Sequence, residues 1–390
     1  MKNILIVGGT GVLSYAIVNE AVKQGMSVTC INRGKSKEQE IPPNVNVIHA
    51  DYRNSAQIER VLEGYYYDAI IDVLCYTEKD IDYSISLFKD KCSQYIFMSS
   101  CAVYNKRGGD FVCDEESELI NPLWDYSINK VKCEQRLIFL ASKHKFNYTI
   151  IRPAITYGNT RIPYGITPPY GYHGTLIQRI MNHKPILLWD EGQTYTTITR
   201  VEDFAIGVVG ILGNEESYGQ SYNIVGDEKI KWIEVLQLLG TLLHKEIKLF
   251  NVSKEILAKE MPHRKGEILG GRGINLLIDN SKIKSVVPGM GTHIPLKEGL
   301  KMTVDYYMNH NYLKGIDYSF DGDWDRIIMK YDKNRIYKLS FVDYLKKNSI
   351  HDKISYFEGK YSTNMFVKSL FKTKNITTRV INCFRNIFNI

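Results

Sequence analysis

Short runs of branched apolar residues alternate with helix-length amphipathic segments over the first 150 positions. The first run, Ile4 to Val7, ends at a glycine and predicts a strand buried on both faces. Further strands are expected at 27–31, 45–49, 69–74, 95–98 and 148–151, with helices at 12–24, 55–63 and 78–90 between them. Strands separated by helices of this length form βαβ units, so we expect an α/β fold with a doubly wound parallel sheet.

A glycine-rich loop joins the first strand to the first helix, with the sequence GGTGVLS at positions 8–14. Glycines let the backbone turn tightly and approach a pyrophosphate, which then rests on the amino end of the helix. The position between a strand and a helix favours a dinucleotide site over a purely structural turn. The expected cofactor contacts in this loop are Gly8, Thr10, Gly11, Val12 and Leu13.

The end of the second strand bears on the choice between NAD and NADP. An NAD site usually has an acidic residue there for the ribose, whereas this chain has Asn32 and Arg33. A guanidinium suits a 2′-phosphate, so Arg33 favours NADP, and its alternative role is to stack on the adenine. Asp51, after the third strand, is placed to accept from the adenine amino group or to cap a helix. The expected cofactor contacts also include Tyr52, Lys130 and Pro153.

A serine, a tyrosine and a lysine form the second chemical pattern. The fifth strand is followed by Ser99 and Ser100, and Tyr126 and Lys130 come later at the i, i+4 spacing of one helix face. An ammonium beside a phenol favours the phenolate, so we expect Lys130 to lower the pKa of Tyr126 from its usual value of about 10. The serine hydroxyl is then suited to hold a substrate oxygen beside the phenol.

Seven motifs in a fixed order extend these two patterns along the chain. They are GGTGVLS at 8–14, MSSCAVY at 98–104, YSINK at 126–130, RPAITYG at 152–158, VEDFA at 201–205, YNIVG at 222–226 and DNSKIK at 279–284. Over residues 1–308 the sequence resembles the extended short-chain dehydrogenase/reductase family, particularly its nucleotide-sugar epimerase and dehydratase branch. The resemblance implies catalysis by Ser100, Tyr126 and Lys130, a nucleotide-sugar substrate and a homodimer.

The resemblance also implies a Rossmann domain and a smaller C-terminal domain that closes over the substrate. We expect the cofactor domain at 1–158, with its sheet completed by about 198–228, and the substrate domain at 159–197 and 229–308. Residues 309–390 are then an appended C-terminal extension.

Departures from the family pattern reduce the number of reactions that we expect this chain to catalyse. Dehydratases of this family carry Thr-Asp-Glu after the fifth strand, where this chain has Ser100-Cys101-Ala102, so a 4,6-dehydratase is not expected. The remaining activities are epimerisation through a keto intermediate, which we favour, and NADPH-dependent reduction of a keto-sugar. A third alternative is a binding protein that senses the cofactor without catalysis, against which the retention of all three catalytic residues argues.

The substrate contacts that the resemblance implies are incomplete. Ile155 and Thr196 occupy positions where the family often has an asparagine and an arginine, whereas Arg264 occupies the place of its diphosphate-binding arginine. Arg200 is the second expected substrate contact. Arg161 and Arg272 are further candidates, and each of these three arginines has an ordinary surface charge as its alternative.

Charge is distributed unevenly along the 390 residues. The net charge of +7 lies entirely in residues 311–390, which carry 15 basic and 8 acidic side chains, so bulk charge does not predict binding to nucleic acid. Seven cysteines without a CxxC pair favour a reducing compartment and no metal site. The apolar start is too short for a signal peptide and no window approaches a membrane span, so we expect a cytoplasmic protein.

The extension contains two further predicted helices, at 340–347 and 377–390. The second is amphipathic with basic polar positions, a pattern that fits docking on its own chain or a partner. The alternative is contact with an anionic membrane through residues 360–390. The run Asp321 to Asp325 lacks the length and the closing glutamate of a calcium loop.

Overall fold

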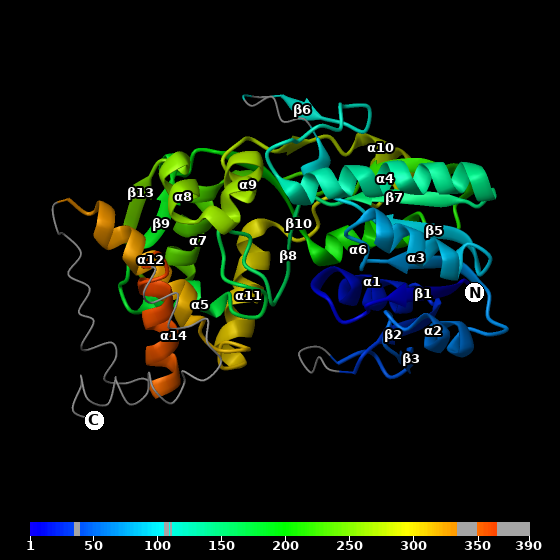
Figure 1. The fold of residues 1–390 in the computed structure, drawn as a ribbon, viewed down its shortest axis with the longest axis horizontal. Helices are drawn as coiled ribbons and strands as arrows, with labels where there is room; N and C mark the ends of the chain where they lie inside the picture. Colours follow the sequence, from blue (N-terminus) through cyan, green and yellow to red (C-terminus); the bar gives the residue numbers. More distant parts are fainter. Residues whose placement is uncertain (35–39, 105–108, 110, 334–348, 365–390) are drawn as a thin grey trace.

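A seven-stranded parallel sheet forms one half of the computed structural model, which describes residues 1–34, 40–104, 109, 111–333 and 349–364 (Figure 1). The strand order is β11-β7-β5-β4-β1-β2-β3, and every neighbouring pair is parallel. This confirms the expected doubly wound sheet. The strands are β1 (Asn3–Val7), β2 (Ser27–Asn32), β3 (Asn46–His49), β4 (Tyr67–Asp72), β5 (Cys92–Met98), β7 (Tyr148–Arg152) and β11 (Gln220–Asn223).

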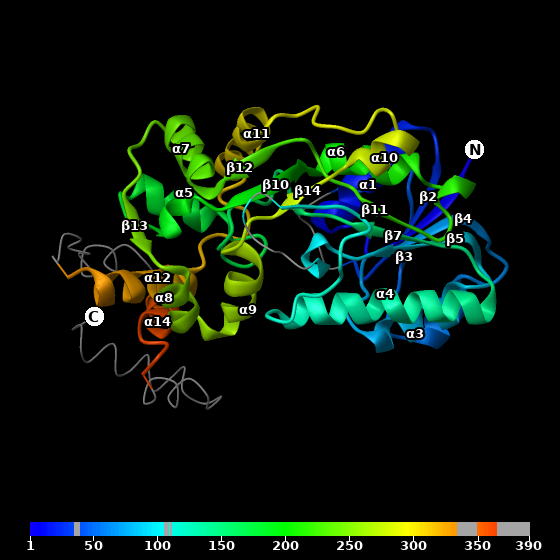
Figure 2. The same cartoon turned by 90° about the horizontal axis from the view of Figure 1, so that it is seen from above.

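Helices cover both faces of this sheet (Figure 2). One face carries α1 (Val12–Lys23), α6 (Val201–Gly210) and α10 (Ser281–Val286). The other carries α2 (Ser55–Val61), α3 (Glu78–Phe88) and α4 (Asp125–His144). Each layer buries an apolar face of its helices against the branched residues of the strands, and so each face has its own core.

The chain leaves β1 toward β2 on one side and returns to β4 on the other. In a doubly wound sheet this reversal opens a crevice at the carboxyl ends of the strands. The glycine-rich loop after β1 and the residues that follow β4 and β5 all lie at that edge. The strand order therefore brings the sequence motifs to one place before any side chain is considered.

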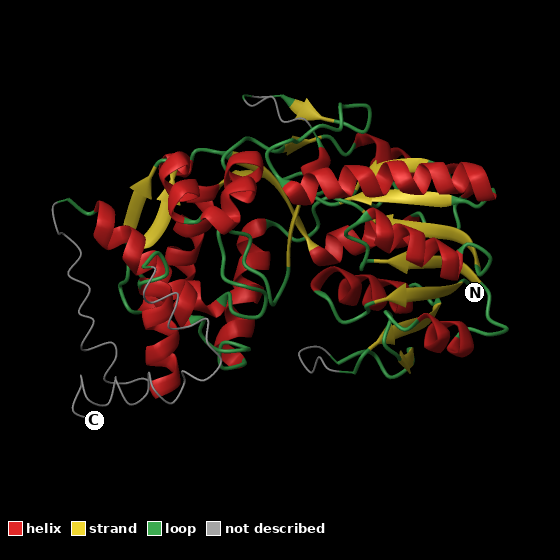
Figure 3. Ribbon diagram, viewed as in Figure 1, coloured by secondary structure: helices red, strands yellow, loops and turns green. Residues whose placement is uncertain are grey.

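The other half of the molecule consists mainly of helices with small sheets (Figure 3). Tyr164, Trp189 and Trp232 form an aromatic centre in its core, and both indole N–H groups donate to the carbonyl of Arg272, at 3.1 and 3.0 Å. Its helices are α5 (Gly174–Met181), α7 (Trp232–Leu243), α8 (Lys254–Glu260), α9 (Lys265–Glu267) and α11 (Leu296–Asn309), with a π-helical turn at Ile268–Arg272. Its short strands, including those that connect the two halves, are β6 (Val112–Cys113), β8 (Ile155–Tyr157), β9 (Ile186–Trp189), β10 (Tyr195–Arg200), β12 (Lys229–Lys231), β13 (Leu249–Val252) and β14 (Leu277–Ile278).

Two helices of the C-terminal extension pack on this second half: α12 (Tyr318–Tyr331) and α14 (Ile350–Lys360). Phe320, Trp324 and Ile327 of α12 belong to the same core cluster as the aromatic centre. The helices expected at 340–347 and 377–390 lie outside the described residues. Across the described ranges, no helix has both the length and the apolar character needed to cross a membrane.

Candidate functional site

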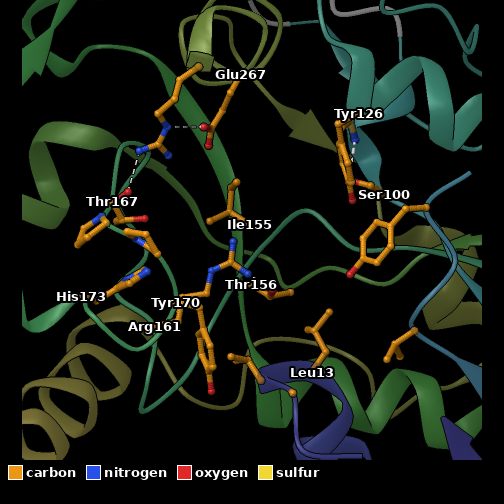
Figure 4. Close-up of a pocket in the computed structure, with 18 of the residues that line it drawn as sticks. Leu13, Ser100, Tyr126, Ile155, Thr156, Arg161, Thr167, Tyr170, His173 and Glu267 are labelled. Atoms are coloured by element: carbon orange, nitrogen blue, oxygen red, sulfur yellow. Dashed lines mark hydrogen bonds and ion pairs between the residues drawn. The ribbon is translucent and has the colours of Figure 1, made fainter. Parts of the chain in front are cut away.

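A cavity of about 1350 Å³ extends from the glycine-rich loop, past the start of α4, to the C-terminal helices. Figure 4 shows Ser100 and Tyr126 on one side of the pocket, Arg161 reaching into it, and Thr167 and Glu267 opposite. All but one of the residues expected in the site line this cavity. They are Gly8, Thr10, Gly11, Val12, Leu13, Asn32, Arg33, Asp51, Tyr52, Ser100, Tyr126, Lys130, Pro153 and Arg264.

The glycine-rich loop has the geometry that a dinucleotide requires. Gly8 has a φ of +89°, in the region that glycine adopts without strain. A Cβ on Gly9 would lie 2.6 Å from Cys30 Sγ, so only glycine lets the loop pack this closely on β2. Ser14 Oγ donates to the Gly8 carbonyl at 2.6 Å and accepts from the Gly11 amide at 3.0 Å, which fixes the turn into α1. Amide groups at the amino end of a helix favour phosphate groups, so the pyrophosphate predicted from the sequence would lie at the start of α1.

The ends of β2 and β3 form the end of the cavity where the sequence predicts the adenosine. The Asn32 side chain accepts from the Gly34 amide at 2.9 Å, and Arg33 is exposed beside it. Asp51 accepts from the Arg53 amide at 3.1 Å. The hydroxyl of Tyr52 donates to buried Asp72 at 2.6 Å, so this tyrosine belongs to the floor of the cavity.

The catalytic candidates converge from β5 and α4. Ser100 caps the short turn after β5, where its Oγ accepts from the Ala102 amide at 3.1 Å. Lys130 is 2% exposed, and its Nζ donates to the carbonyls of Cys75 and Met98, both at 2.7 Å. That ammonium lies 5.9 Å from the ring centroid of Tyr126.

The electrostatics of Tyr126 differ from the sequence expectation. Burial raises the pKa of Tyr126, while the Ser100 hydroxyl and the charges of Arg161 and Arg272 act in the opposite direction. Lys130 is turned toward the two carbonyls, and burial lowers its own pKa. The cations that favour the phenolate are therefore chiefly the two arginines.

Three arginines and one glutamate line the part of the cavity beyond Tyr126. Arg264 pairs with Glu267 at 2.7 Å and donates to the Thr167 carbonyl at 2.7 Å, and Arg272 lies 3.4 Å from the same carboxylate. Burial and the charge of Arg272 lower the pKa of Arg161 to about 10. Burial alone would raise the pKa of Glu267, but Arg272 and Arg264 hold it below its usual value. One carboxylate thus faces three guanidinium groups, which leaves an excess of positive charge.

Arg200 is the expected site residue that the structure does not bring to this cavity. It is buried at the end of β10, where it pairs with Glu202 at 2.6 Å and donates to the Gly299 carbonyl at 3.0 Å. Its guanidinium therefore joins β10 to α6 and α11 and has a structural role.

The loop before α4 contributes to the site in a way that the motifs did not reveal. The ring of Trp124 lies 5.0 Å from that of Tyr126 and 5.9 Å from the Arg272 guanidinium. Asn121 Nδ2 donates to the Ala102 carbonyl at 3.0 Å and to the Gly270 carbonyl at 2.7 Å. The position of Trp124 two residues before Tyr126, and the glycines at 266, 270 and 271 that pack against residues 121–124, were the available signals.

Comparison with known proteins identifies related sequences. The model of the NAD dependent epimerase/dehydratase family matches residues 4–225. Chloroplast stem-loop binding protein of 41 kDa b from Arabidopsis thaliana is 27% identical over 241 residues, which span 59% of this chain and 60% of that relative. UDP-N-acetyl-alpha-D-glucosaminuronate decarboxylase from Bacillus cytotoxicus is 25% identical over 329 residues, which span 78% of this chain and 98% of that relative.

Solved structures share the fold. UDP-glucuronic acid 4-epimerase from Bacillus cereus, in complex with UDP-glucuronic acid and NAD, superposes with a TM-score of 0.63 at 18% identity. The match covers 79% of this chain and 99% of that one, so about a fifth of this chain lies outside it. At this identity the likeness concerns the fold alone.

Proposed function

The chain belongs to the NAD dependent epimerase/dehydratase family, and we propose that it is an NAD(P)-dependent epimerase of a nucleotide-activated sugar. The observation that carries the proposal is the cavity itself, which joins a dinucleotide-binding loop, the Ser100–Tyr126–Lys130 set and a cluster of arginines. The first two are needed for oxidation at a ring carbon, and the third suits the diphosphate of an activated sugar.

A nicotinamide cofactor held by the glycine-rich loop and Lys130 would supply the reversible hydride transfer at a ring carbon that epimerisation through a keto-sugar requires. Tyr126 takes the proton from the ring hydroxyl during oxidation, and it returns a proton to the carbonyl oxygen when the carbon is reduced again. Ser100 orients that oxygen beside the phenol. Two of the three donors of Lys130 are held by carbonyls, and the third is available to a cofactor ribose hydroxyl.

Substrate charge is matched by the arginines beyond Tyr126. Arg264 and Arg272 share the carboxylate of Glu267 and Arg161 lines the same cavity, so an ionised diphosphate would compensate the remaining positive charge of these three arginines. Planar guanidinium groups bind phosphate oxygens through paired N–H donors. Two sequence relatives, the UDP-N-acetyl-alpha-D-glucosaminuronate decarboxylase from Bacillus cytotoxicus and a putative UDP-glucose 4-epimerase from Methanocaldococcus jannaschii, support the same substrate class.

The Tyr126→Phe variant tests this mechanism. Removal of the hydroxyl takes away the general acid and base, so we expect turnover to fall by about 10²- to 10⁴-fold while the cofactor stays bound. The assay measures epimer formation from UDP-glucose and UDP-glucuronic acid, with cofactor content measured in parallel. Tyr65→Phe, which alters an exposed tyrosine outside the cavity, is the matched control. Full activity in Tyr126→Phe refutes the mechanism.

Arg33 supports NADP as the cofactor and with it a second candidate function, the NADPH-dependent reduction of a keto-sugar. No carboxylate stands at residues 32–34, at the end of β2, and Arg33 lines the cavity there. The mass of the nucleotide released on denaturation distinguishes NADP, which we expect, from NAD. Activity without added cofactor supports the epimerase, whereas consumption of one NADPH per turnover supports the reductase.

A further inference from the structure

The outer end of the cavity is lined by residues that follow the part of the chain resembling the family, which ends at residue 308. The start of α12 and the end of α14 contribute seven of the lining residues, which are Asp317, Ser319, Phe320, Asp323, Gly359, Ser362 and Thr363. Arg264, Pro262 and Pro168 line the same cavity. The extension is therefore part of the wall of the site.

The two helices cross at a contact that only glycine permits. A Cβ on Gly359 would stand 1.8 Å from the Ser319 carbonyl oxygen, and one on Gly322 would stand 2.2 Å from that of Tyr356. At the same crossing, the Ser362 hydroxyl at the end of α14 donates to Asp323 of α12 at 2.8 Å. This close approach holds the cavity-lining ends of α12 and α14 against each other.

The extension also holds the segment that carries the arginines. Glu260, at the end of α8, accepts from Arg326 at 2.5 Å, Lys330 at 2.7 Å and Tyr331 at 2.8 Å, all on α12. Glu260 precedes Arg264 by four residues. The position of the segment that carries Arg264 and Arg272 is thus linked directly to the docking of α12.

We propose that α12 and α14 form a subsite for the nucleoside end of the substrate. Along the cavity, Tyr126 marks the reacting carbon and the arginines mark the diphosphate, so the group attached beyond the diphosphate lies against the extension. This inference rests on the proposed function, because it takes the substrate to be a nucleotide sugar.

The chemistry of the outer wall suits a base and a ribose. Pro168, Pro262 and Phe320 offer apolar surfaces to a planar ring. The hydroxyls of Ser319 and Thr363 can both donate and accept, as a ribose or a base edge requires, and that of Ser362, which donates to Asp323, can accept. Both nearby carboxylates are already engaged, which reduces their repulsion of an anionic nucleotide: Asp323 pairs with Arg326 at 2.9 Å, and Asp317 accepts from the Phe320 amide at 2.9 Å.

Binding measurements test the subsite without relying on turnover. The cofactor-loaded full chain is titrated by calorimetry with UDP, dTDP, GDP, CDP and ADP, and with inorganic pyrophosphate. We expect at least one nucleoside diphosphate to bind about tenfold or more tightly than pyrophosphate, because the subsite recognises the nucleoside. Pyrophosphate itself reports on the arginines alone.

Two variants alter the outer wall. Thr363→Trp fills the mouth from an exposed position, and the double variant Ser319→Ala/Ser362→Ala removes two hydroxyls without adding bulk. We expect the first to abolish the preference for the nucleoside diphosphate and the second to weaken its binding by about fivefold or more, with pyrophosphate unchanged in both. Glu358→Trp, an exposed position of α14 outside the cavity, is the control and retains wild-type affinities.

The outcomes separate this inference from the proposed function. Wild-type affinity for the nucleoside diphosphate in both wall variants overturns the subsite while the nucleotide-sugar proposal stands. Equal weakening of nucleoside diphosphate and pyrophosphate also overturns it, because the effect is then not specific to the nucleoside. If neither probe binds the wild-type protein, the nucleotide-sugar substrate itself is refuted and the subsite falls with it.

Discussion

Asp321→Asn removes one of two buried carboxylates that hold α12 on the rest of the molecule. Asp321 and Asp325 face Arg179 and Lys184, and no side chain of the four is more than 8% exposed. The variant leaves two cations opposite a single carboxylate. Asp321 makes a charged contact with each cation, and such contacts contribute about 1.5–3 kcal/mol each. Breaking a buried pair costs about 3–5 kcal/mol, so we expect a loss of roughly that size in the free energy of unfolding.

Equilibrium unfolding in urea measures this loss. Tryptophan fluorescence is a suitable signal, because Trp324 lies on α12, is fully buried and packs 4.8 Å from Phe320. The matched control is Asp82→Asn, which removes the partner of Arg136 in an ion pair whose side chains are 35% and 45% exposed. Exposed pairs of this kind contribute about 0–1 kcal/mol.

The difference in stability between the two variants shows whether the buried charges hold α12 in place. If Asp321→Asn loses no more stability than Asp82→Asn, the four buried charges do not hold the extension in place. An early fluorescence transition in Asp321→Asn that disappears in Asp321→Asn/Trp324→Phe would show that α12 separates before the rest of the chain unfolds, because three other tryptophans contribute to the signal.

Two further predictions concern charge near the site. Burial alone would raise the pKa of Glu260, but Lys330 and Arg326 lower it to about 2. Its stabilisation is therefore complete above its unfolded pKa of about 4.3 and is lost as the pH falls from there through about 2. Urea midpoints measured across this range should fall more in wild type than in Glu260→Gln, and equal falls would contradict the assignment. Arg161→Met removes a charge that lowers the pKa of Tyr126, so the acidic limb of the pH profile of kcat/KM, which reports formation of the phenolate base, should move to higher pH, whereas the exposed control Arg60→Met leaves it unchanged.

Six of the seven strands of the parallel sheet could be predicted because each has a local apolar signal, whereas β11, with the sequence QSYN, has none. The strand expected at 69–74 is β4 at 67–72, and this shift has a physical cause. Tyr67 pairs with Cys92 at the start of β5, and the strand ends at Asp72, whose carboxylate is satisfied by Tyr52 and Ser84 at 2.6 Å. A strand that ends in a buried polar residue has no apolar signal at that position, so the hydrophobic pattern does not predict where it ends.

The second half of the molecule has no comparable local signal. Its β9 pairs in parallel with β13, so that Ile186 lies opposite Leu249, more than sixty positions away. The direction in which an arginine side chain points could not be predicted from motif spacing either. Arg200 was expected in the site because of its place in the chain, yet it turns toward Glu202 and α11, whereas Arg161, an alternative on the same grounds, reaches the cavity.

The acidic run in α12 explains how a basic extension can dock on a charge-balanced body. At helical spacing, Asp321 and Asp325 share one face and meet Arg179 and Lys184, while Asp323 points to the cavity side and pairs with Arg326. The described parts of the extension, 311–333 and 349–364, carry six basic and seven acidic side chains, whereas 334–348 and 365–390 carry nine basic and one acidic. The segment that docks is thus nearly neutral and uses its carboxylates for buried pairs. The surplus positive charge of the sequence therefore lies in segments other than the two that carry α12 and α14.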